Sequence, residues 1–254
     1  MQMFLKEPVY CFTSDIEWAP EWAIREMLSF FRDRSIPLTP FSTHHSMALK
    51  EFFPGKENER RVGLHPNFLM PSSHGKNPTE VIETVCALWP KAQGFRSHCF
   101  YEDSRTLRDL ASRGFLYDSN LALHLQPLCT PLFHHTGIIR FPVFWEDDVH
   151  FTREAELDFH RLQRHFDSPG LKVINIHPLI FCLNAPTLDY YTQRKFLNQE
   201  HGELWRKEVY PGRGIRTFVE EMLKNTRTKN YRSEYLHDLY EEVSNSLTTS
   251  QILP

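Results

Sequence analysis

The sequence predicts an α/β fold in which six or seven short strands alternate with helices, and three observations support it. Apolar β-rich runs alternate along the chain with segments whose apolar residues recur at helical spacing. These runs are apolar on both faces, as buried parallel strands are. Only 10 of the 254 residues are glycine and no phosphate-binding glycine loop occurs, which favours a (β/α) barrel over a nucleotide-binding open sheet.

The first part of the chain predicts a β-α-β unit followed by another strand. Ile24, Met27, Leu28 and Phe31 recur at the spacing of a buried helix face. Apolar β-rich runs flank and follow this helix, at residues 9–13, 37–41 and 61–65.

Capping residues mark the helices in the middle of the chain. Asn77 is a favourable N-cap, Pro78 suits the first helical position, and Glu80 stands where a capping box places its acid. A second helix has its apolar face over residues 107–111 and is stopped by Gly114. Short strands are expected beside these helices, at residues 94–98 and 117–120.

The last part of the chain predicts two strands, over residues 138–145 and 171–176, and a helix between them that Thr152 caps. Residues from about 215 to 243 predict a helical extension that packs across the barrel or against a partner subunit. Because no repeat, low-complexity tract or linker occurs, we expect residues 1–254 to form a single domain.

Composition and charge exclude several classes of protein. With 29 basic against 32 acidic side chains and no stripe of Lys or Arg, the chain lacks the positive surface that a nucleic-acid partner requires. Its five cysteines include no CxxC pair, which argues against a disulfide framework or a thiolate zinc site. Residues 1–9 lack the apolar core of a signal peptide, and no run of about 18 apolar residues occurs. We therefore expect a cytoplasmic protein without a transmembrane segment.

Reactive side chains gather at the ends of five expected strands. In a parallel α/β barrel the carboxyl ends of the strands lie on one face, where residues distant in sequence meet. The sequence therefore predicts one polar site on that face. The five strand ends are Thr13-Ser14-Asp15-Ile16-Glu17-Trp18, Gly63-Leu64-His65-Pro66-Asn67, Arg96-Ser97-His98, Trp145-Glu146-Asp147-Asp148 and Asn175-Ile176-His177-Pro178.

Asp15 and Glu17 are the first candidates for chemistry. Alternate residues of a strand point to the same side, so both carboxylates share one site and need a cation or a proton to offset their repulsion. A divalent metal ion would do so, but the two acids would also suit the first turn of the following helix. His177 ends a buried run, so its imidazole must find a partner. The other candidates have ordinary alternatives: half-buried imidazoles for His65 and His74, a surface ion pair for Arg96, and a solvated turn for residues 146–148.

Together these motifs resemble the polysaccharide deacetylases, also called NodB-homology or carbohydrate esterase family 4 proteins, over roughly residues 9–183. The first motif of that family supplies a general base and a metal ligand, which the resemblance places at Asp15 and Glu17, although the two roles can be swapped. An arginine motif, which orients the catalytic carboxylate, matches Arg96. A histidine motif, which supplies the general acid, matches His177.

The resemblance also implies the fold and one further role. The fold implied is a distorted (β/α)7 barrel of the NodB-homology type. The acidic, tryptophan-bearing motif of the family matches residues 144–148 loosely, and Asp148 is then expected to orient the general acid.

The second motif is where the sequence departs from the family pattern. The family places two metal-binding histidines four residues apart, but Leu69 stands four residues after His65 and cannot bind a metal. We expect His74 to be brought back by its loop and to complete the metal site with Glu17 and His65. The reserve candidate is His98, which stands where the family has a proline.

The resemblance implies a metal-dependent N-deacetylase, with zinc as the expected metal. In that reaction Asp15 would deprotonate the attacking water and His177 would protonate the departing amine. The implied substrate is an N-acetylated sugar, linked to a nucleotide or a lipid, in the synthesis of a bacterial surface polysaccharide such as O-antigen. Two alternatives stay open: a metal hydrolase of another small amide or ester, and a catalytically inactive carbohydrate-binding or scaffold protein on the same fold.

Overall fold

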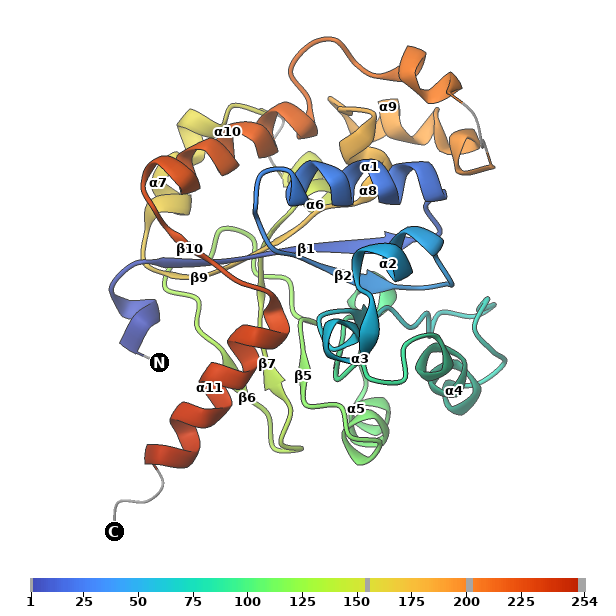
Figure 1. Cartoon of the computed structure of the whole chain (residues 1–254), viewed down its shortest axis with the longest axis vertical. Coiled ribbons are helices and arrows are strands. Elements are labelled where there is room, and N and C mark those ends of the chain that lie inside the picture. The colour runs from blue at the N-terminus through green and yellow to red at the C-terminus, as the bar shows by residue number, and fades with distance from the viewer. Residues whose placement is uncertain (1, 154–155, 200–202, 251–254) are drawn as a thin grey trace.

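The computed structural model describes residues 2–153, 156–199 and 203–250. A curled sheet forms its centre (Figure 1), and the longest strand, β1 (Pro8–Glu17), pairs in parallel with β2 (Leu38–Ser42) and β9 (Gly170–Asn175). The other strands are β3 (Gly63–Leu64), β4 (Gly94–Phe95), β5 (Tyr117–Asp118), β6 (Leu132–Phe133), β7 (Ile139–Arg140), β8 (Val143–Glu146) and β10 (Arg232–Ser233).

The strand order shows how far the sheet curls. It runs β6-β7-β5-β4-β3-β2-β1-β9-β8, and β10 pairs with the start of β1. The strand at the far end of this order, β8, lies beside the segment that follows β5, because Ala122 forms a parallel bridge to Val143. The sheet is therefore a curled half-barrel of the NodB type, and the predicted fold class is confirmed.

Helices cover the outer face of this sheet. The helix α1 (Glu21–Arg32) packs on α8 (Pro178–Cys182), and α10 (Ile215–Thr228) packs on α8 and α7 (Phe159–Asp167), all on one side of β1 in Figure 1. The remaining α-helices are α2 (Met47–Phe52), α3 (Gly55–Glu59), α4 (Pro78–Leu88), α5 (Ser104–Ser112), α6 (Asp147–Arg153), α9 (Leu188–Thr192) and α11 (Leu236–Ser250). The 3₁₀ turns are η1 (Gln2–Leu5), η2 (His98–Phe100), η3 (Lys195–Gln199) and η4 (Leu204–Glu208).

The alternation of side chains along β1 divides the core in two. Tyr10 and Phe12 pack among the outer helices, whereas Val9 and Cys11 belong to the inner cluster that α11 joins. Asp15 continues the inner series at the carboxyl end of the strand. The first catalytic candidate therefore lies inside the mouth of the half-barrel.

Predicted caps occur where the residues dictate them. The Asn77 side chain accepts a hydrogen bond from the backbone N–H of Glu80 at 3.0 Å and starts α4. Gly114 has a φ of +89° just after α5, in the region that favours glycine.

Three predicted elements differ from the structure. The run over residues 138–145 is divided into β7 and β8 at Pro142, which has no N–H to donate to a ladder. The cap of α7 is Asp158 and not Thr152, whose hydroxyl bonds the Val149 carbonyl within α6. The C-terminal extension is two helices with β10 between them, where a continuous helical segment was expected.

No helix in the described part of the chain has the length and apolar character needed to cross a membrane.

Candidate active site

The end of β1 presents two carboxylates at different depths. Asp15 is paired with Phe41 and Glu17 with Ser42 of β2, and the register shifts between these pairs. Glu17 has a φ of +50°, a conformation that residues other than glycine rarely adopt. Asp15 is buried, whereas the Glu17 side chain is 28% exposed. The shift therefore carries Glu17 outward, toward the mouth.

Glu17 meets two histidines there. Its Oε1 lies 2.8 Å from His98 Nδ1 and 3.4 Å from His65 Nε2. Burial opposes ionisation of Glu17, but the contacts with His65 and His98 outweigh it and lower the pKa of this carboxyl strongly. The ligating atoms of the three side chains lie within 4.8 Å of one another. One carboxylate oxygen and two imidazole nitrogens are a donor set that zinc and related divalent ions accept.

His65 is the member of this donor set whose surroundings fit a metal ligand. The side chain is 1% exposed, and within the described ranges neither ring nitrogen has a hydrogen-bond partner. The nearest polar atoms are carboxylate oxygens, at 3.4 Å on Glu17 and 3.6 Å on Asp15. Because a buried imidazole without a partner is costly, a divalent ion beside Nε2 fits the residues present.

His74 lies in a different environment from the one expected. Its Nδ1 accepts a hydrogen bond from the backbone N–H of Asn67 at 3.0 Å, and its Nε2 is 2.8 Å from the Thr43 carbonyl. Both ring nitrogens therefore hold neighbouring loops together and neither is available as a ligand. The expectation that His74 joins Glu17 and His65 is wrong, because the structure brings the reserve candidate His98 to them instead.

Asp15 is held by two buried side chains. Arg96 Nη1 donates to Asp15 Oδ1 at 2.9 Å, and Asn175 Nδ2 donates to Asp15 Oδ2 at 2.9 Å. Burial opposes ionisation of Asp15, but Arg96 and then His65 outweigh it and lower the pKa of the carboxyl. Arg96 is fully buried, and its other nitrogens donate to the carbonyl and hydroxyl of Ser119. Asp15 is thus an ionised carboxylate in a fixed orientation.

The acid that contacts His177 is Asp147, where Asp148 was expected. Asp147 Oδ1 is 2.6 Å from His177 Nδ1, and Asp147 Oδ2 accepts the backbone N–H of His177 at 2.8 Å. Burial works against the imidazolium, but Asp147 outweighs it and raises the pKa of His177 well above its usual range. Asp148, in contrast, faces the cavity with an elevated pKa caused by burial.

A cavity of about 320 Å³ lies at the mouth of the half-barrel, and the acids and imidazoles that line it are Asp15, Glu17, His98, Glu146, Asp148 and His177. The segment after β9 supplies one wall, through Leu188, Tyr191 and Lys195. A hollow of about 310 Å³ adjoins it and includes Trp18, whose ring stands edge-on to His98 with centroids 5.3 Å apart. The site therefore combines acids and imidazoles at depth with aromatic and cationic groups at the rim.

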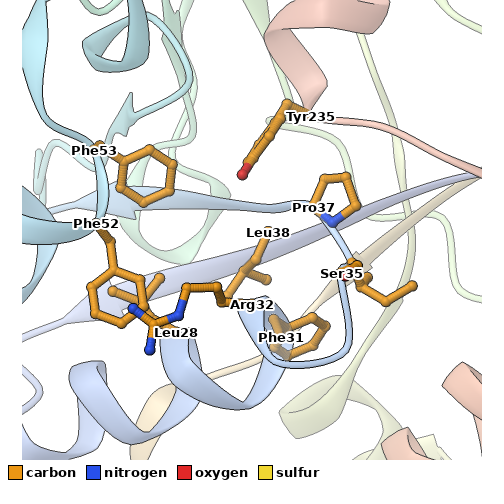
Figure 2. A pocket seen from close by; sticks show the side chains of 10 residues that line it. Leu28, Phe31, Arg32, Ser35, Pro37, Leu38, Phe52, Phe53 and Tyr235 are labelled. Atoms are coloured by element: carbon orange, nitrogen blue, oxygen red, sulfur yellow. The ribbon is translucent and has the colours of Figure 1, made fainter.

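Another hollow, of about 290 Å³, lies between the end of α1 and the start of β2 (Figure 2), toward the amino ends of the strands. Among the described residues that line it there is no carboxylate or imidazole. Its lining residues are Leu28, Phe31, Arg32, Ser35, Ile36, Pro37, Leu38, Phe52, Phe53 and Tyr235.

Asn175 and Asp147 belong to the site but were not candidates from the sequence. Asn175 stands two positions before His177, so strand alternation places both on the inner face. Asp147 is one of three consecutive acids, and only the exact turn from β8 into α6 selects it as the partner of His177. The alternation of side chains along the strand could have indicated Asn175. No signal in the sequence distinguishes Asp147 from its acidic neighbours.

A curled, mostly parallel half-barrel with an acid-histidine cluster at the carboxyl ends of its strands defines the class of polysaccharide deacetylases. The family model for WbmS-like polysaccharide deacetylases matches residues 12–195. The chain therefore belongs to the WbmS-like polysaccharide deacetylase family, and the family resemblance expected from the sequence is confirmed.

Two solved structures are among those similar to this chain. A protein from Bordetella bronchiseptica, described as a polysaccharide deacetylase involved in O-antigen biosynthesis, has 25% sequence identity and a TM-score of 0.74, with 85% of this chain and 90% of that chain covered. A protein described as a polysaccharide deacetylase from Mycobacterium smegmatis has 16% identity and a TM-score of 0.47, with 90% and 93% covered. A comparison with curated proteins finds no match.

Proposed function

We propose that this protein is a metal-dependent deacetylase that removes an N-acetyl group from a sugar in the synthesis of a bacterial surface polysaccharide. The observation that carries the proposal is the convergence of three side chains beside an ionised Asp15: Glu17, His98 and His65, whose buried imidazole has no hydrogen-bond partner among the described residues. This arrangement supports a cation site next to a general base.

The ligands that we propose for the metal are Glu17, His65 and His98. When bound there, a zinc or other divalent ion would polarise the acetamide carbonyl as a Lewis acid. Three protein ligands leave positions open for water and substrate, as in catalytic zinc sites. His74 takes no part in this set, since its ring nitrogens bind the backbone.

Two proton transfers fall to the chain itself. Asp15, fixed by Arg96 and Asn175, accepts a proton from the attacking water as the C–O bond forms. His177, held protonated by Asp147, donates its proton to the sugar nitrogen as the C–N bond breaks. The products are acetate and a free amino sugar.

The substrate class rests on the relative from Bordetella bronchiseptica, which is described as acting in O-antigen biosynthesis. By that similarity we propose an N-acetylated sugar that is linked to a nucleotide or a lipid. Trp18 and Tyr191, which line the rim of the cavity, provide faces on which a sugar ring can stack.

Acetate release from N-acetylated sugars tests the proposal. The full-length protein, purified without a histidine tag and loaded with zinc, is incubated with free, nucleotide-linked and lipid-linked N-acetylhexosamines. We expect acetate release that stops on chelation and returns with zinc. A protein that binds zinc yet releases no acetate from any of these sugars would instead be a metal hydrolase of another substrate or a non-catalytic binding protein.

A further inference from the structure

Glu146, the last residue of β8, has no role in the mechanism above. It is 4% exposed and lines the catalytic cavity together with Asp15 and His177. One side-chain polar atom from each of these three residues lies within 4.8 Å of the other two. A carboxyl group this close to both proton-transfer residues must have a defined charge and a defined partner.

Asn175 fixes the orientation of this carboxyl group. Arg96 has only hydrogen-bond donors, so the Asn175 atom that lies 2.6 Å from Arg96 Nη1 is the amide oxygen. The amide nitrogen then points the other way, with Asp15 Oδ2 and Glu146 Oε1 each at 2.9 Å. One of its two hydrogens is donated to Asp15 and the other to Glu146. Oε1 of Glu146 is therefore an acceptor, and any proton on the carboxyl resides on Oε2.

The second carboxyl oxygen of Glu146, Oε2, lies in a different environment from Oε1. It is buried, and no hydrogen-bond partner for it occurs within the described ranges. Two cations lie nearby but have closer partners: Arg96 is bound to Asp15, and His177, whose Nε2 lies 4.0 Å from Glu146 Oε1, makes its short contact with Asp147. Burial, and then Asp148, raise the pKa of Glu146 well above its usual range.

A bound proton neutralises the charge of the Glu146 carboxyl better than a second metal ion would. An ion between Asp15 and Glu146 would stand beside the Arg96 guanidinium, and both Asp15 oxygens already accept hydrogen bonds. A ligand role for His177 would also remove the general acid. The neutral acid keeps Oε2 as a donor, and no acceptor for it occurs among the described residues.

We propose that Glu146 binds the substrate as an uncharged carboxylic acid, donating a hydrogen bond from Oε2 to a substrate oxygen held between Asp15 and His177. This inference rests on the proposed deacetylase function and names a substrate-binding group that the mechanism did not require. The oxygen belongs to the acetyl group or to the neighbouring sugar hydroxyl, because both lie beside the bond that breaks.

Two substitutions test whether Glu146 acts as a hydrogen-bond donor or as a negatively charged carboxylate. Glu146→Gln keeps Oε1 as an acceptor and places an N–H donor at Oε2, whereas Glu146→Leu removes both. With the N-acetylhexosamine derivative that releases acetate fastest, we expect Glu146→Leu to lower kcat/KM by about 10- to 100-fold. Glu146→Gln should recover most of that loss. Equal losses in both variants would overturn the proposal, because a needed negative charge is missing from both.

Acetate binding and infrared spectra give a test that needs no sugar substrate. Acetate, the product of every deacetylation, is titrated into the zinc-loaded proteins, and we expect its Kd to rise about tenfold in Glu146→Leu and much less in Glu146→Gln. The infrared difference between wild type and Glu146→Gln at neutral pH should contain a protonated carboxyl band. A carboxylate band, or a second bound zinc ion per chain, contradicts the proposal even if deacetylation is confirmed.

Discussion

Arg96 and Asp15 stand 81 positions apart in the chain and form a fully buried ion pair, with Nη1 and Oδ1 2.9 Å apart. The arginine leaves the end of β4 and the aspartate the end of β1, so the curl of the sheet alone brings them together. An aspartate in that position stays ionised, which a general base requires.

Arg96→Met is expected to destabilise the protein by about 3–5 kcal/mol, because it leaves a buried carboxylate without its counter-ion. Denaturant unfolding of the zinc-free protein measures the change. Arg105→Met, at an exposed position of α5, is the control and should stay within about 0.5 kcal/mol of wild type. An Arg96→Met protein as stable as the control would mean that the pair is not formed.

His98→Ala is expected to abolish stoichiometric zinc binding, since one of three protein ligands is lost. His74→Ala is the matched comparison and should keep about one zinc per chain. It should also lose about 1–3 kcal/mol of stability, because the Asn67 N–H and the Thr43 carbonyl lose their partner. Metal analysis after dialysis decides between the two histidines, and zinc lost from His74→Ala but kept in His98→Ala would reverse the assignment.

Asp147→Asn is expected to lower kcat by about 10²- to 10⁴-fold, because His177 loses the partner that keeps it protonated and oriented. Asp148→Asn should have a smaller effect, since Asp148 makes no hydrogen bond to the His177 ring among the contacts of the described residues. The two variants are compared at saturating substrate. Equal losses in both would return the orienting role to Asp148.

The pH dependence of the rate gives a separate check on the same pair. Asp147 raises the pKa of His177, so the general acid stays protonated to higher pH than a free imidazole. Activity should therefore persist above neutral pH in the wild type. In Asp147→Asn the alkaline limb of the kcat profile should move to lower pH, and an unchanged limb would show that His177 is not the group that titrates.

Lys172 predicts a pH dependence of stability away from the site. It is fully buried on β9, where its Nζ donates to Ser168 Oγ at 3.0 Å, and burial lowers its pKa from 10.5 to about 8. Between these two values the unfolded chain binds more protons than the folded one, so this group makes stability rise with pH. Below about pH 8 it costs the folded state about 1–3 kcal/mol.

Lys172→Met should remove that cost and gain stability at pH 7. Relative to this variant, the wild type should recover stability between pH 7 and pH 9.5, as measured by denaturant unfolding. A constant difference between the two proteins across that range would mean that Lys172 keeps an ordinary pKa in the folded state.

The strand ends predicted which side chains would lie close together. Asp15, Glu17, His65, Arg96 and His177 follow apolar runs, and in a parallel half-barrel such positions must meet at one edge. The sequence favoured His74 over His98 as the companion of Glu17 and His65, and the structure shows the reverse. His74 and His98 are both polar loop residues after short strands, and only the path of the 67–74 loop turns His74 onto the backbone of Asn67 and Thr43.

What the sequence by itself determined was the α/β class, the capped helices and the set of strand ends that carry chemistry. Those properties follow from side-chain periods and caps that act over a few residues. Only the tertiary structure decided that His98 accompanies Glu17 and His65, and that Asp147 orients His177. The register shift before Glu17 and the turn from β8 into α6 depend on packing across the whole sheet, and one residue of shift exchanges the side chains that face the mouth.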